Sequence, residues 1–514
     1  MVAKTFGGTT YGVDASIITV EVNIVQGTHF FLVGLPDNAI KESQQRIEST
    51  LKHLEYKMPR QKVVVNLAPA DVRKEGSAYD LPIALSILKA SKQIEGATLE
   101  QYVILGELAL DGILRPIKGS LPIAIEARKH GFKGFILPKE NAEEAAIVND
   151  LDVIGVENIQ EAIDYLEGVS EIKPLFRDTR DLFAYNQNSF DVDFSDVQGQ
   201  DNIKRAMEVA AAGGHNVIMV GPPGSGKTML AKRLATILPP LSLTEALETT
   251  KIHSVAGKLP VNSSLIADRP FCSPHHTISD VALVGGGNIP QPGQISLSHN
   301  GVLFLDELPE FKRTVLEVMR QPLEERHVTI SRAKGTVSFP ANFMLIASMN
   351  PSPSGDFYVP GQPHPDSPAA VHKYMSKISA PLLDRIDLHI EVNPVSFDRM
   401  TGNEQAESSE TIRQRVIKAR EVQHARFKAL DATYIHSNAM MPSQMIKKLC
   451  TIDELAKKLL KTAMQKLGLS ARAYDRILKV ARTIADLADS EQIKPEHIAE
   501  AIQYRSLDRE GWAG

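Results

Sequence analysis

The residues with the clearest chemical potential form a glycine-rich loop between two apolar segments. The loop consists of Gly221, Pro222, Pro223, Gly224, Ser225, Gly226, Lys227 and Thr228. Residues 217–220 before it have the pattern of a buried strand, and residues 229–235 after it have that of a helix. In this context, backbone N–H groups and a helix N-terminus can surround a phosphate chain. The sequence therefore predicts a phosphate-binding loop, in which Lys227 reaches the β- and γ-phosphates and Thr228 holds Mg²⁺.

Two acidic residues, Asp306 and Glu307, follow a second apolar segment at 301–305. A buried strand of an α/β sheet delivers such residues to the edge where nucleotides bind. We expect Asp306 to hold Mg²⁺ and Glu307 to orient and polarise the attacking water. An acidic pair after a strand is also compatible with a solvated turn. The phosphate loop, whose Lys227 lies 79 positions earlier (306 minus 227), favours the catalytic interpretation.

The bulk composition indicates an ordinary globular protein of three or four domains. The chain has 514 residues, of which 43% are hydrophobic and 23% charged. Its net charge of −5 means that any nucleic-acid contact must be local. Cys272 and Cys450 are far apart, which fits a reducing compartment and gives neither a disulfide framework nor a thiolate metal site. The sequence shows no signal core and no membrane-spanning stretch, so we expect a cytoplasmic protein without a membrane partner.

Residues 1–170 alternate strand-like and helix-like segments, which predicts an α+β front domain. Short β-branched runs predict strands at 17–22 and 63–67. Apolar spacing predicts helices at 38–54 and 80–91. The dipeptide Asp111-Gly112 predicts a hairpin over 107–114.

This front domain resembles the protease domain of the Lon family, which has a ribosomal S5 domain 2-like fold. The resemblance rests on residues 106–112, 116–119 and 136–138, with Asn141. The family uses a serine–lysine pair, whose positions fall here on Ala78 and Leu121. Ser77 and Lys118 lie nearby, so a shifted register stays open. We favour a protease-like fold without proteolysis, since function depends on site residues and not on fold.

After an expected linker at 171–193, the chain resembles AAA+ ATPases. Residues 194–212, which end at Gly213-Gly214, resemble the segment that lies against the adenine. Asn350, after the apolar segment 343–348, matches the first sensor, which hydrogen-bonds the water and the γ-phosphate. The alternative for Asn350 is a plain turn residue before a proline.

Two arginines match AAA+ positions that act on the γ-phosphate. Arg385 resembles the arginine finger that reaches a neighbouring subunit, although an ion pair with Asp384 or Asp387 is the alternative. Arg472, in the first turn of a late helix, resembles the second sensor, and the alternative is a surface arginine. A finger that acts in trans implies an oligomer.

Two segments between and after the nucleotide motifs have several interpretations. His275 and His276 could suggest a metal, but adjacent histidines on a strand point to opposite faces and no acid completes the set. The run 285–287 predicts a mobile glycine loop. Residues 327–339 predict a β-hairpin with Arg332 and Lys334 at its tip. Such residues are commonly only solvated, but in a ring motor they can hold a phosphate backbone.

The C-terminal region, 396–514, has the pattern of a small helical lid. A capping-box form at Thr411 predicts a basic helix to about residue 427. Amphipathic spacing predicts further helices at 455–467 and 473–487.

The order and the residues of these motifs closely resemble those of the ComM/YifB family of magnesium-chelatase-like AAA+ proteins, over essentially the whole chain. The most specific segments are 273–277, 293–298, 305–311 and 377–387. The resemblance implies an α/β multidomain protein: a Lon-protease-like front (1–170), a linker (171–193), a P-loop AAA+ core (194–395) and an α-helical lid (396–514). Many relatives have cysteines after the first sensor, where this chain has Ser352 and Ser354, so their thiolate metal site is absent.

The family resemblance implies ATP and Mg²⁺ as cofactors and a homo-oligomer, a hexamer, as the working form. It implies a DNA helicase that promotes branch migration in recombination and natural transformation. A chelatase-type or protein-remodelling motor without a DNA substrate is the main alternative, and an ATP-switched scaffold is a third. The Lon-like front argues against a dedicated chelatase subunit.

Overall fold

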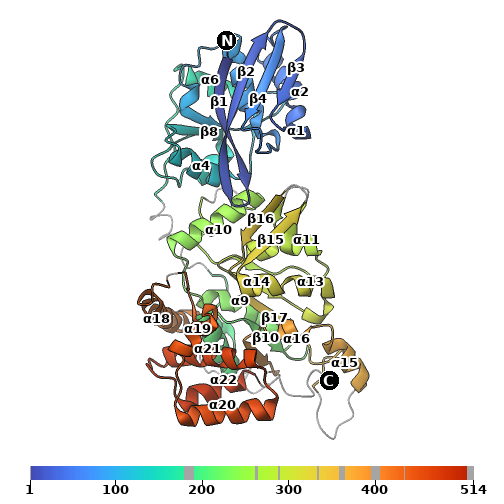
Figure 1. Cartoon of the computed structure of the whole chain (residues 1–514), viewed down its shortest axis with the longest axis vertical. Helices are drawn as coiled ribbons and strands as arrows, with labels where there is room; N and C mark the ends of the chain where they lie inside the picture. The colour runs from blue at the N-terminus through green and yellow to red at the C-terminus, as the bar shows by residue number, and fades with distance from the viewer. Residues whose placement is uncertain are drawn as a thin grey trace.

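The computed structural model describes residues 2–178, 190–260, 264–287, 290–332, 335–357, 365–394, 406–432 and 434–505. The molecule is elongated, with the front domain at one end and the nucleotide core and lid at the other (Figure 1). Helix α10 (Leu243–Ala256) lies between them. The predicted α/β multidomain class is confirmed. Within the described ranges, no helix combines the length and apolarity needed to cross a bilayer.

The front domain is built on a seven-stranded mixed sheet with the order β3-β4-β2-β1-β5-β8-β9. Its strands are β1 (Val2–Tyr11), β2 (Asp14–Val25), β3 (Phe30–Val33), β4 (Lys62–Ala68), β5 (Tyr102–Ile104), β8 (Gly134–Pro138) and β9 (Asp152–Val156). Its helices are α1 (Asn38–Lys41), α2 (Ser43–His53), α3 (Asp80–Ala90), α4 (Ser120–Lys129), α5 (Lys139–Ala145) and α6 (Ile159–Leu166). The β-branched residues that predict strands alternate in burial along β4, as a half-covered sheet requires.

Two front-domain predictions differ from the structure in detail. The single helix expected over 38–54 is interrupted at Glu42, the residue that caps α1 and precedes α2. Both pieces still bury the residues that predict the helix, Ile40 and Ile47. The expected hairpin forms, but only as the short strands β6 (Glu107–Leu108) and β7 (Leu114–Arg115).

The core is a parallel five-stranded sheet with the order β11-β14-β17-β10-β18. Its strands are β10 (Val217–Val220), β11 (Phe271–Cys272), β14 (Val302–Leu305), β17 (Met344–Met349) and β18 (Leu388–Glu391). Alternate residues of β10 enter different apolar clusters: Val217 and Met219 face one, Ile218 and Val220 the other. Both faces of the sheet are therefore covered, which explains the continuous apolar runs in the sequence.

Different elements cover the two faces of the core sheet. One cluster includes α8 (Asp201–Gly213), α9 (Lys227–Ile237) and the lid. The other includes α13 (Arg313–Val318), α14 (Arg320–Glu325) and the hairpin of β15 (His327–Arg332) and β16 (Gly335–Pro340). The core sheet thus connects the lid on one side with the hairpin on the other.

The glycine run at 285–287 is not the loop that we expect from the sequence. After α11 (Asp280–Val284), strand β12 (Gly285–Gly286) pairs with β13 (Gln291–Pro292), and α12 (Gln294–Leu297) follows. A Cβ on Gly285 would lie 2.4 Å from the carbonyl oxygen of Gln291. The close approach of two backbones therefore explains the glycine at position 285.

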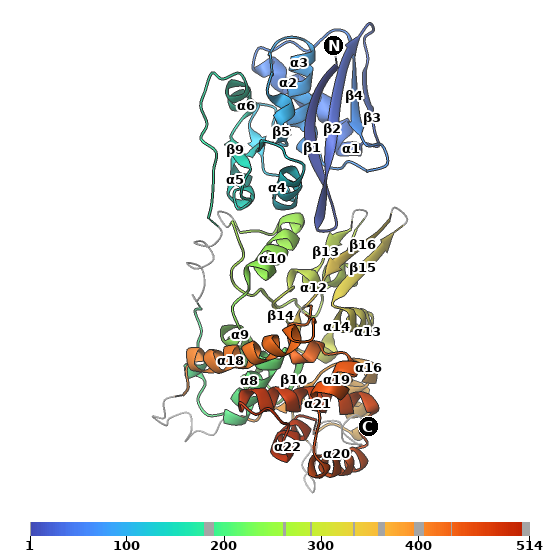
Figure 2. The same cartoon turned by 60° about the vertical axis from the view of Figure 1, so that its left-hand side comes forward.

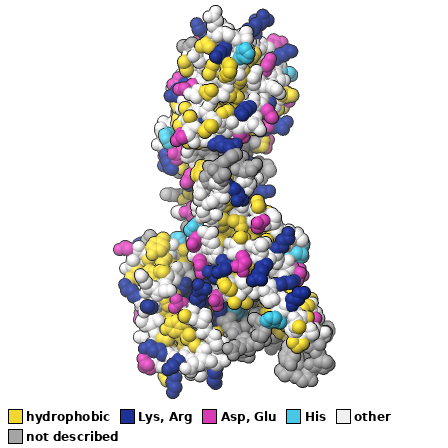
Figure 3. Space-filling model, turned by 45° about the vertical axis from the view of Figure 1, so that its right-hand side comes forward, with side chains coloured by type: hydrophobic (Ala, Val, Ile, Leu, Met, Phe, Trp, Pro, Cys, Tyr) yellow, Lys and Arg dark blue, Asp and Glu magenta, His cyan; other side chains and the backbone are white. Residues whose placement is uncertain are grey.

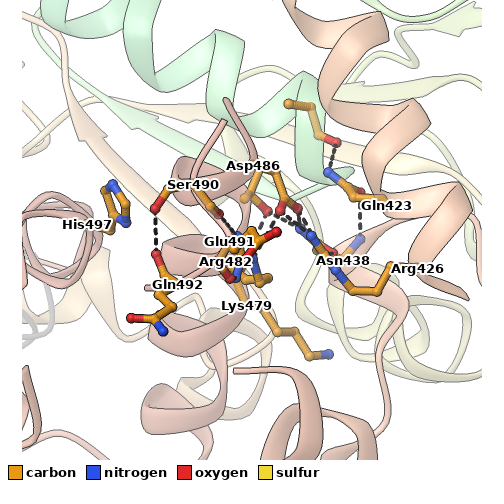
Figure 4. A network of polar contacts seen from close by, with 12 residues as sticks. Gln423, Arg426, Asn438, Lys479, Arg482, Asp486, Ser490, Glu491, Gln492 and His497 are labelled. Atoms are coloured by element: carbon orange, nitrogen blue, oxygen red, sulfur yellow. Dashed lines mark hydrogen bonds and ion pairs between the residues drawn. The ribbon is translucent and has the colours of Figure 1, made fainter. Parts of the chain in front are cut away.

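The lid consists of α18 (Ser409–Lys428), α19 (Ser443–Leu449), α20 (Glu454–Leu467), α21 (Ala471–Leu487) and α22 (Pro495–Gln503). Helix α18 begins earlier than the capping-box pattern predicts, because the Ser408 side chain accepts from the Thr411 N–H. Figure 4 shows the buried polar network inside the lid. There the Asp486 carboxylate accepts from Arg426 (3.1 Å), Asn438 (2.8 Å) and Arg482 (3.0 Å), which joins α18 to α21.

The front domain rests on α10 and on the hairpin of β15 and β16 (Figure 2). Ala246 of α10 belongs to the apolar cluster of the front domain. The Gly119 N–H donates to the Ser254 carbonyl (3.1 Å), and the Tyr11 hydroxyl donates to the Thr336 carbonyl (2.9 Å). Helix α10 and the hairpin, which contact the front domain, both lie outside the five-stranded core sheet. Neither contact is evident from the sequence.

The expected domain limits fall between elements of the structure. Helix α6 ends at Leu166 and the 3₁₀ turn η3 (Phe194–Asp196) begins the core. The expected linker at 171–193 lies partly outside the described residues, as does the junction at 395–396 between β18 and α18. The limits themselves stay a prediction.

Candidate active site

The phosphate loop connects β10 to α9 at the carboxyl edge of the parallel sheet. Gly224 and Gly226 have φ angles of 76° and 91°, which favour glycine. A Cβ on Gly221 would lie 2.2 Å from the Val392 carbonyl oxygen, whereas a Cβ on Gly224 would meet nothing within 4 Å. The loop is thus packed tightly at its base and open at its tip, where backbone amides and the N-terminus of α9 can receive an anion.

The Lys227 ammonium group lies across the loop and is satisfied by neutral acceptors. Its Nζ donates to the carbonyls of Gly221 (2.6 Å) and Pro222 (2.9 Å) and to Asn350 Oδ1 (3.2 Å). Burial lowers the pKa of Lys227, although Asp306 and Glu307 act in the opposite direction. A phosphate oxygen is a stronger acceptor than a carbonyl, so the group is prepared to bind a phosphate chain.

Thr228, Asp306 and Ser348 form a set of hard oxygen ligands. The Thr228 hydroxyl donates to Asp306 Oδ2 (2.8 Å), and the Ser348 hydroxyl donates to Asp306 Oδ1. Oxygen ligands of this kind fit Mg²⁺, which takes few protein ligands and retains water. Sequence analysis misses Ser348, whose signal is a polar residue within the apolar strand β17.

Glu307 projects from a constrained backbone beside this set. Its φ of 54° and ψ of 51° lie in the left-handed region, which is uncommon for a non-glycine residue and occurs at turns such as this one. Its N–H donates to Asp306 Oδ1 (3.1 Å) and to Ser348 Oγ (3.3 Å). The Glu307 side chain is 59% exposed. A carboxylate in this position can reach a water molecule in the open part of the site.

His276 contacts Glu307, which corrects the sequence-based view of the two histidines. His276 Nδ1 lies 3.6 Å from Glu307 Oε2. The rings of His275 and His276 lie side by side, with centroids 4.1 Å apart, instead of on opposite faces. The facing argument fails because β11 ends at Cys272, before the histidines. No group of three or more metal-ligating side chains occurs in the part of the chain that the structure describes.

The structure gathers Asn350 into the site but leaves the two arginines outside it. Arg385 is only 6% exposed; its Nη2 lies 2.6 Å from Glu324 Oε1 and its Nη1 donates to the Pro381 carbonyl (2.5 Å). Its ion-pair partner is therefore Glu324 and neither of the two aspartates expected from the sequence. Arg472 is 60% exposed, with Nη1 3.9 Å from Asp384 Oδ2.

The hairpin of β15 and β16 carries Arg332 at its distal end. Arg332 pairs with Gly335 across the hairpin, and its side chain is exposed. Its Nη1 donates only to the neighbouring Ser331 carbonyl (3.4 Å) among the contacts of the described residues. Lys334, the second basic residue expected at this tip, lies outside the described residues.

The front domain places non-nucleophilic residues where the Lon pair is expected. Leu121 is fully buried in α4, and Ala78 is half-buried. In the alternative register, the Ser77 hydroxyl donates to the Glu107 carboxylate, and the exposed Lys118 lies against Gly257 of the core. These two side chains thus have different partners.

Family models match three consecutive parts of the chain. "Magnesium chelatase, subunit ChlI" matches residues 193–400, "Subunit ChlI of Mg-chelatase" matches 20–141, and "Magnesium chelatase, subunit ChlI C-terminal" matches 406–505. The first of these contains every residue of the nucleotide site. Along the chain, the three matched regions correspond in order to the front domain, the core and the lid.

Known proteins with similar sequences include full-length and partial relatives. Competence protein ComM of Haemophilus influenzae is 43% identical over 99% of this chain and 98% of that protein. Uncharacterized protein YifB of Escherichia coli is 42% identical over 97% and 96%. Lon protease 2 of Bacillus subtilis is 32% identical over 27% of this chain and 26% of that protein.

The full-length sequence similarity and the geometry of the site indicate the same protein family. Identity above 40% extends over nearly the entire length of both chains. The matched core holds Lys227, Thr228, Asp306, Glu307 and Asn350 together, and membership of an AAA+ family implies the use of ATP and Mg²⁺. The chain belongs to the ComM/YifB family of magnesium-chelatase-like AAA+ proteins, with a Lon-protease-like front domain.

Proposed function

We propose that this protein is a Mg²⁺-dependent ATPase whose turnover drives a ring motor on DNA, as a helicase that promotes branch migration. The observation that carries the ATPase part is one connected cluster. Lys227 contacts Asn350, Thr228 contacts Asp306, and Asp306 contacts the Glu307 N–H. These groups come from the ends of three adjacent parallel strands, β14, β17 and β10. Phosphoryl transfer needs this combination of positioning and charge stabilisation.

Each residue of the cluster has a separate role in hydrolysis. The phosphate-loop amides and Lys227 hold the phosphate chain, and Thr228 and Asp306 hold Mg²⁺, which when bound offsets the charge of the phosphate oxygens. Glu307 orients a water molecule and accepts its proton. Asn350 donates a neutral hydrogen bond near that water, and His276, whose Nδ1 lies 3.6 Å from Glu307 Oε2, helps to orient the Glu307 carboxylate.

The DNA part of the proposal rests on the hairpin and on the named relative. Arg332 is exposed at the end of a paired strand, where it can contact a phosphate backbone. The Haemophilus influenzae relative is named a competence protein, which fits DNA handling during natural transformation. On the face shown in Figure 3, Lys and Arg side chains are interspersed with Asp and Glu. That face therefore offers no broad basic surface, which favours a local contact at the hairpin.

The ring is proposed to be a homo-oligomer, most simply a hexamer. AAA+ proteins typically oligomerise, and a trans contact would give Arg385 a role that its position in the single chain does not. Within the described chain, Arg385 contacts Glu324 and not the phosphate loop. We also propose that Arg472 senses the γ-phosphate, either in its own subunit or in the next.

The front domain is proposed to be non-proteolytic. Ala78 and Leu121 cannot supply a nucleophile and a base. Incubation of an unfolded protein with the full chain, ATP and Mg²⁺ should produce no fragments. ATP-dependent cleavage that Ser77→Ala abolishes would show that the shifted register is the functional one.

The experiment that tests the motor is ATPase measurement with three additions: forked DNA, four-way DNA and an unfolded protein. We expect both DNA structures to raise turnover and the protein to leave it unchanged, with strand displacement that requires ATP. Glu307→Gln serves as the inactive control. Stimulation by the protein alone would favour the chelatase-type or protein-remodelling alternative, and no stimulation by any addition would favour an ATP-switched scaffold.

A further inference from the structure

A cavity of about 70 Å³ lies at the edge of the core sheet opposite the phosphate loop. Its lining includes residues that precede three strands: Gly214 lies three positions before the start of β10, and Gly301 and Phe343 directly precede β14 and β17. The strands are parallel, so the nucleotide site lies at their other ends. The five residue steps from Gly301 to Asp306 span about 16 Å. The cavity is therefore distinct from the nucleotide site, and it has room for several water molecules or a small anion.

Three arginines from three parts of the molecule line this cavity. Arg269 comes from the segment before β11, Arg326 from the end of α14 and Arg420 from α18 of the lid. Among the described residues that line it, Glu245 is the one acid. The Glu245 carboxylate lies 3.5 Å from Arg269 and accepts from the Ser242 N–H (2.8 Å). Two positive charges thus remain without a carboxylate in the lining.

The guanidinium groups are held in place by neutral carbonyls. Arg420 donates to the carbonyls of His436 (2.8 Å) and Ala211 (3.0 Å), and Arg326 donates to that of Phe343 (2.9 Å). These bonds fix the positions of the groups but do not neutralise their charge. The buried Nε of Arg420 has no hydrogen-bond partner within the described chain.

Burial of these charges is unfavourable in the protein alone. Burial lowers the pKa of Arg269 and of Arg326, and it lowers the pKa of Arg420 to about 9, with repulsion from Arg269 as the second cause. The nearby Asp387 that partly offsets Arg326 is itself bound by Arg476. An uncompensated buried charge is costly, and an anion between the arginines would remove that cost.

We propose that this cavity is a binding site for a small phosphate-type oxyanion, either inorganic phosphate or the phosphate group of a phosphomonoester. Arg269, Arg326 and Arg420 all line the cavity, and their N–H groups that no carbonyl accepts, including the Arg420 Nε, can donate to the oxygens of a phosphate group. The volume of about 70 Å³ restricts the enclosed part of the ligand to a group of about this size.

The bound anion would connect the lid to the core. Arg420 belongs to α18 of the lid, whereas Arg326 and Arg269 belong to the core (Figure 2). Arg269 and Arg420, whose charges repel each other in the free protein, become bridged together with Arg326 when the anion binds. The ligand therefore stabilises the arrangement in which α18 lies against the core, at a distance from the nucleotide.

The test uses the full chain carrying Lys227→Ala, so that the phosphate loop contributes little. Calorimetric titrations with inorganic phosphate and with AMP would be compared with chloride at equal ionic strength. We expect saturable binding of at least one probe and a rise in melting temperature with the same concentration dependence. Binding of phosphate but not of AMP identifies a free oxyanion site, and tighter binding of AMP identifies a phosphomonoester site.

Arg326→Gln and Arg420→Gln should each weaken this binding at least tenfold, whereas the exposed Arg128→Gln in the front domain should leave it unchanged. Met440→Phe, which fills the cavity without removing a charge, should also abolish binding and serves if an arginine variant does not fold. The proposal is overturned if neither probe binds saturably, or if the folded cavity variants bind as tightly as the Arg128→Gln control.

Discussion

At the scale of single residues, the proposed roles of Lys227 and Glu307 differ: Lys227 binds phosphate, and Glu307 activates water. Lys227 donates to loop carbonyls and Asn350, whereas the Glu307 side chain extends into solvent. We therefore predict that Glu307→Gln keeps ATP affinity but lowers turnover by about 10²- to 10⁴-fold, the usual contribution of a general base. Lys227→Ala should lose affinity as well, because it removes ground-state contacts. Nucleotide titration and steady-state ATPase assays measure the two effects.

The matched control for Glu307→Gln is Glu310→Gln, three residues away in the same turn. Glu310 pairs with Lys377 at the surface (3.1 Å) and does not belong to the cluster. Its replacement should leave both affinity and turnover within about twofold, as for most surface changes. Equal loss of affinity in Glu307→Gln and Lys227→Ala would contradict the assignment.

His276 provides a second prediction at this scale. Its Nδ1 lies 3.6 Å from Glu307 Oε2, and we propose that it positions the carboxylate electrostatically. His276→Ala should therefore lower kcat by about tenfold and leave ATP affinity unchanged. His275→Phe is the control, since it keeps a ring beside His276 (centroids 4.1 Å apart) and removes only the nitrogen that bonds Thr277 (2.9 Å). A parallel change in affinity, or an equal effect of both variants, would show that the histidines act through the stability of the loop.

At the scale of elements, the sequence predicts those parts of the structure that depend on local pattern. The loop at 221–228, the acidic pair after β14 and the lid helices α18, α20 and α21 follow from spacing and glycine position, whereas the shorter lid helices α19 and α22 are not predicted. Contacts between distant segments have no such signal. Glu324, which is paired with Arg385, and Thr336, which accepts from Tyr11, lie 61 and 325 positions from their partners (385 minus 324; 336 minus 11). Only the fold brings them together.

The hairpin of β15 and β16 provides the test of the DNA contact. Each phosphate contact to single-stranded DNA adds about −0.7 to the log–log slope of affinity against salt. Changing Arg332 and Lys334 together to alanine should therefore weaken DNA binding and flatten this slope. Basal ATPase activity should persist, because Lys227, Asp306 and Glu307 are unchanged, but strand displacement should be lost. DNA affinity measured at several salt concentrations decides the outcome.

The control for the hairpin variant removes two positive charges elsewhere. Lys447 and Lys448 are exposed at the end of α19 in the lid. Their replacement by alanine should change neither the salt slope nor strand displacement. Should both double variants flatten the slope equally, the effect would reflect overall charge, and the hairpin would not be the DNA contact.

At the scale of the whole molecule, buried histidines connect stability to pH. His215 joins the core to the lid, with Nε2 2.8 Å from Thr483 Oγ1, and burial lowers its pKa despite the nearby Asp387. Burial, followed by repulsion from Arg505, lowers the pKa of His389 well below its ordinary value. Below about pH 6.5, these two histidines therefore bind protons in the unfolded chain but stay neutral in the folded chain. Stability is fully present above that pH and is lost as the pH falls.

We predict that the free energy of unfolding decreases between pH 7 and pH 5, by about 1.4 kcal/mol per pH unit for each such proton. Asp387 acts with the same sign at lower pH, because its pKa is held far below its usual range despite burial, chiefly by Arg476. Urea titrations at several pH values measure the slope, and His215→Gln should make it shallower by one proton. A stability independent of pH over this range would contradict the prediction.

Also at this scale, the proposed oligomer can be tested through Arg385, the proposed trans arginine finger. We predict that Arg385→Ala keeps ATP binding but abolishes hydrolysis, because a finger contributes charge only in the transition state. Mixing this variant with Glu307→Gln should restore activity. Random assembly of equal amounts places an intact Glu307 opposite an intact Arg385 at about one interface in four. ATPase activity across a range of mixing ratios measures the rescue.

Glu324 distinguishes a trans finger from a structural ion pair. In the single chain, Arg385 is buried against Glu324, so it must leave that partner to reach a neighbouring subunit. Glu324→Gln weakens the pair but keeps the guanidinium group, and a trans role therefore predicts that hydrolysis is retained or increased. A purely structural role predicts that Glu324→Gln and Arg385→Ala lower the melting temperature and the activity alike, and that no mixing ratio restores turnover.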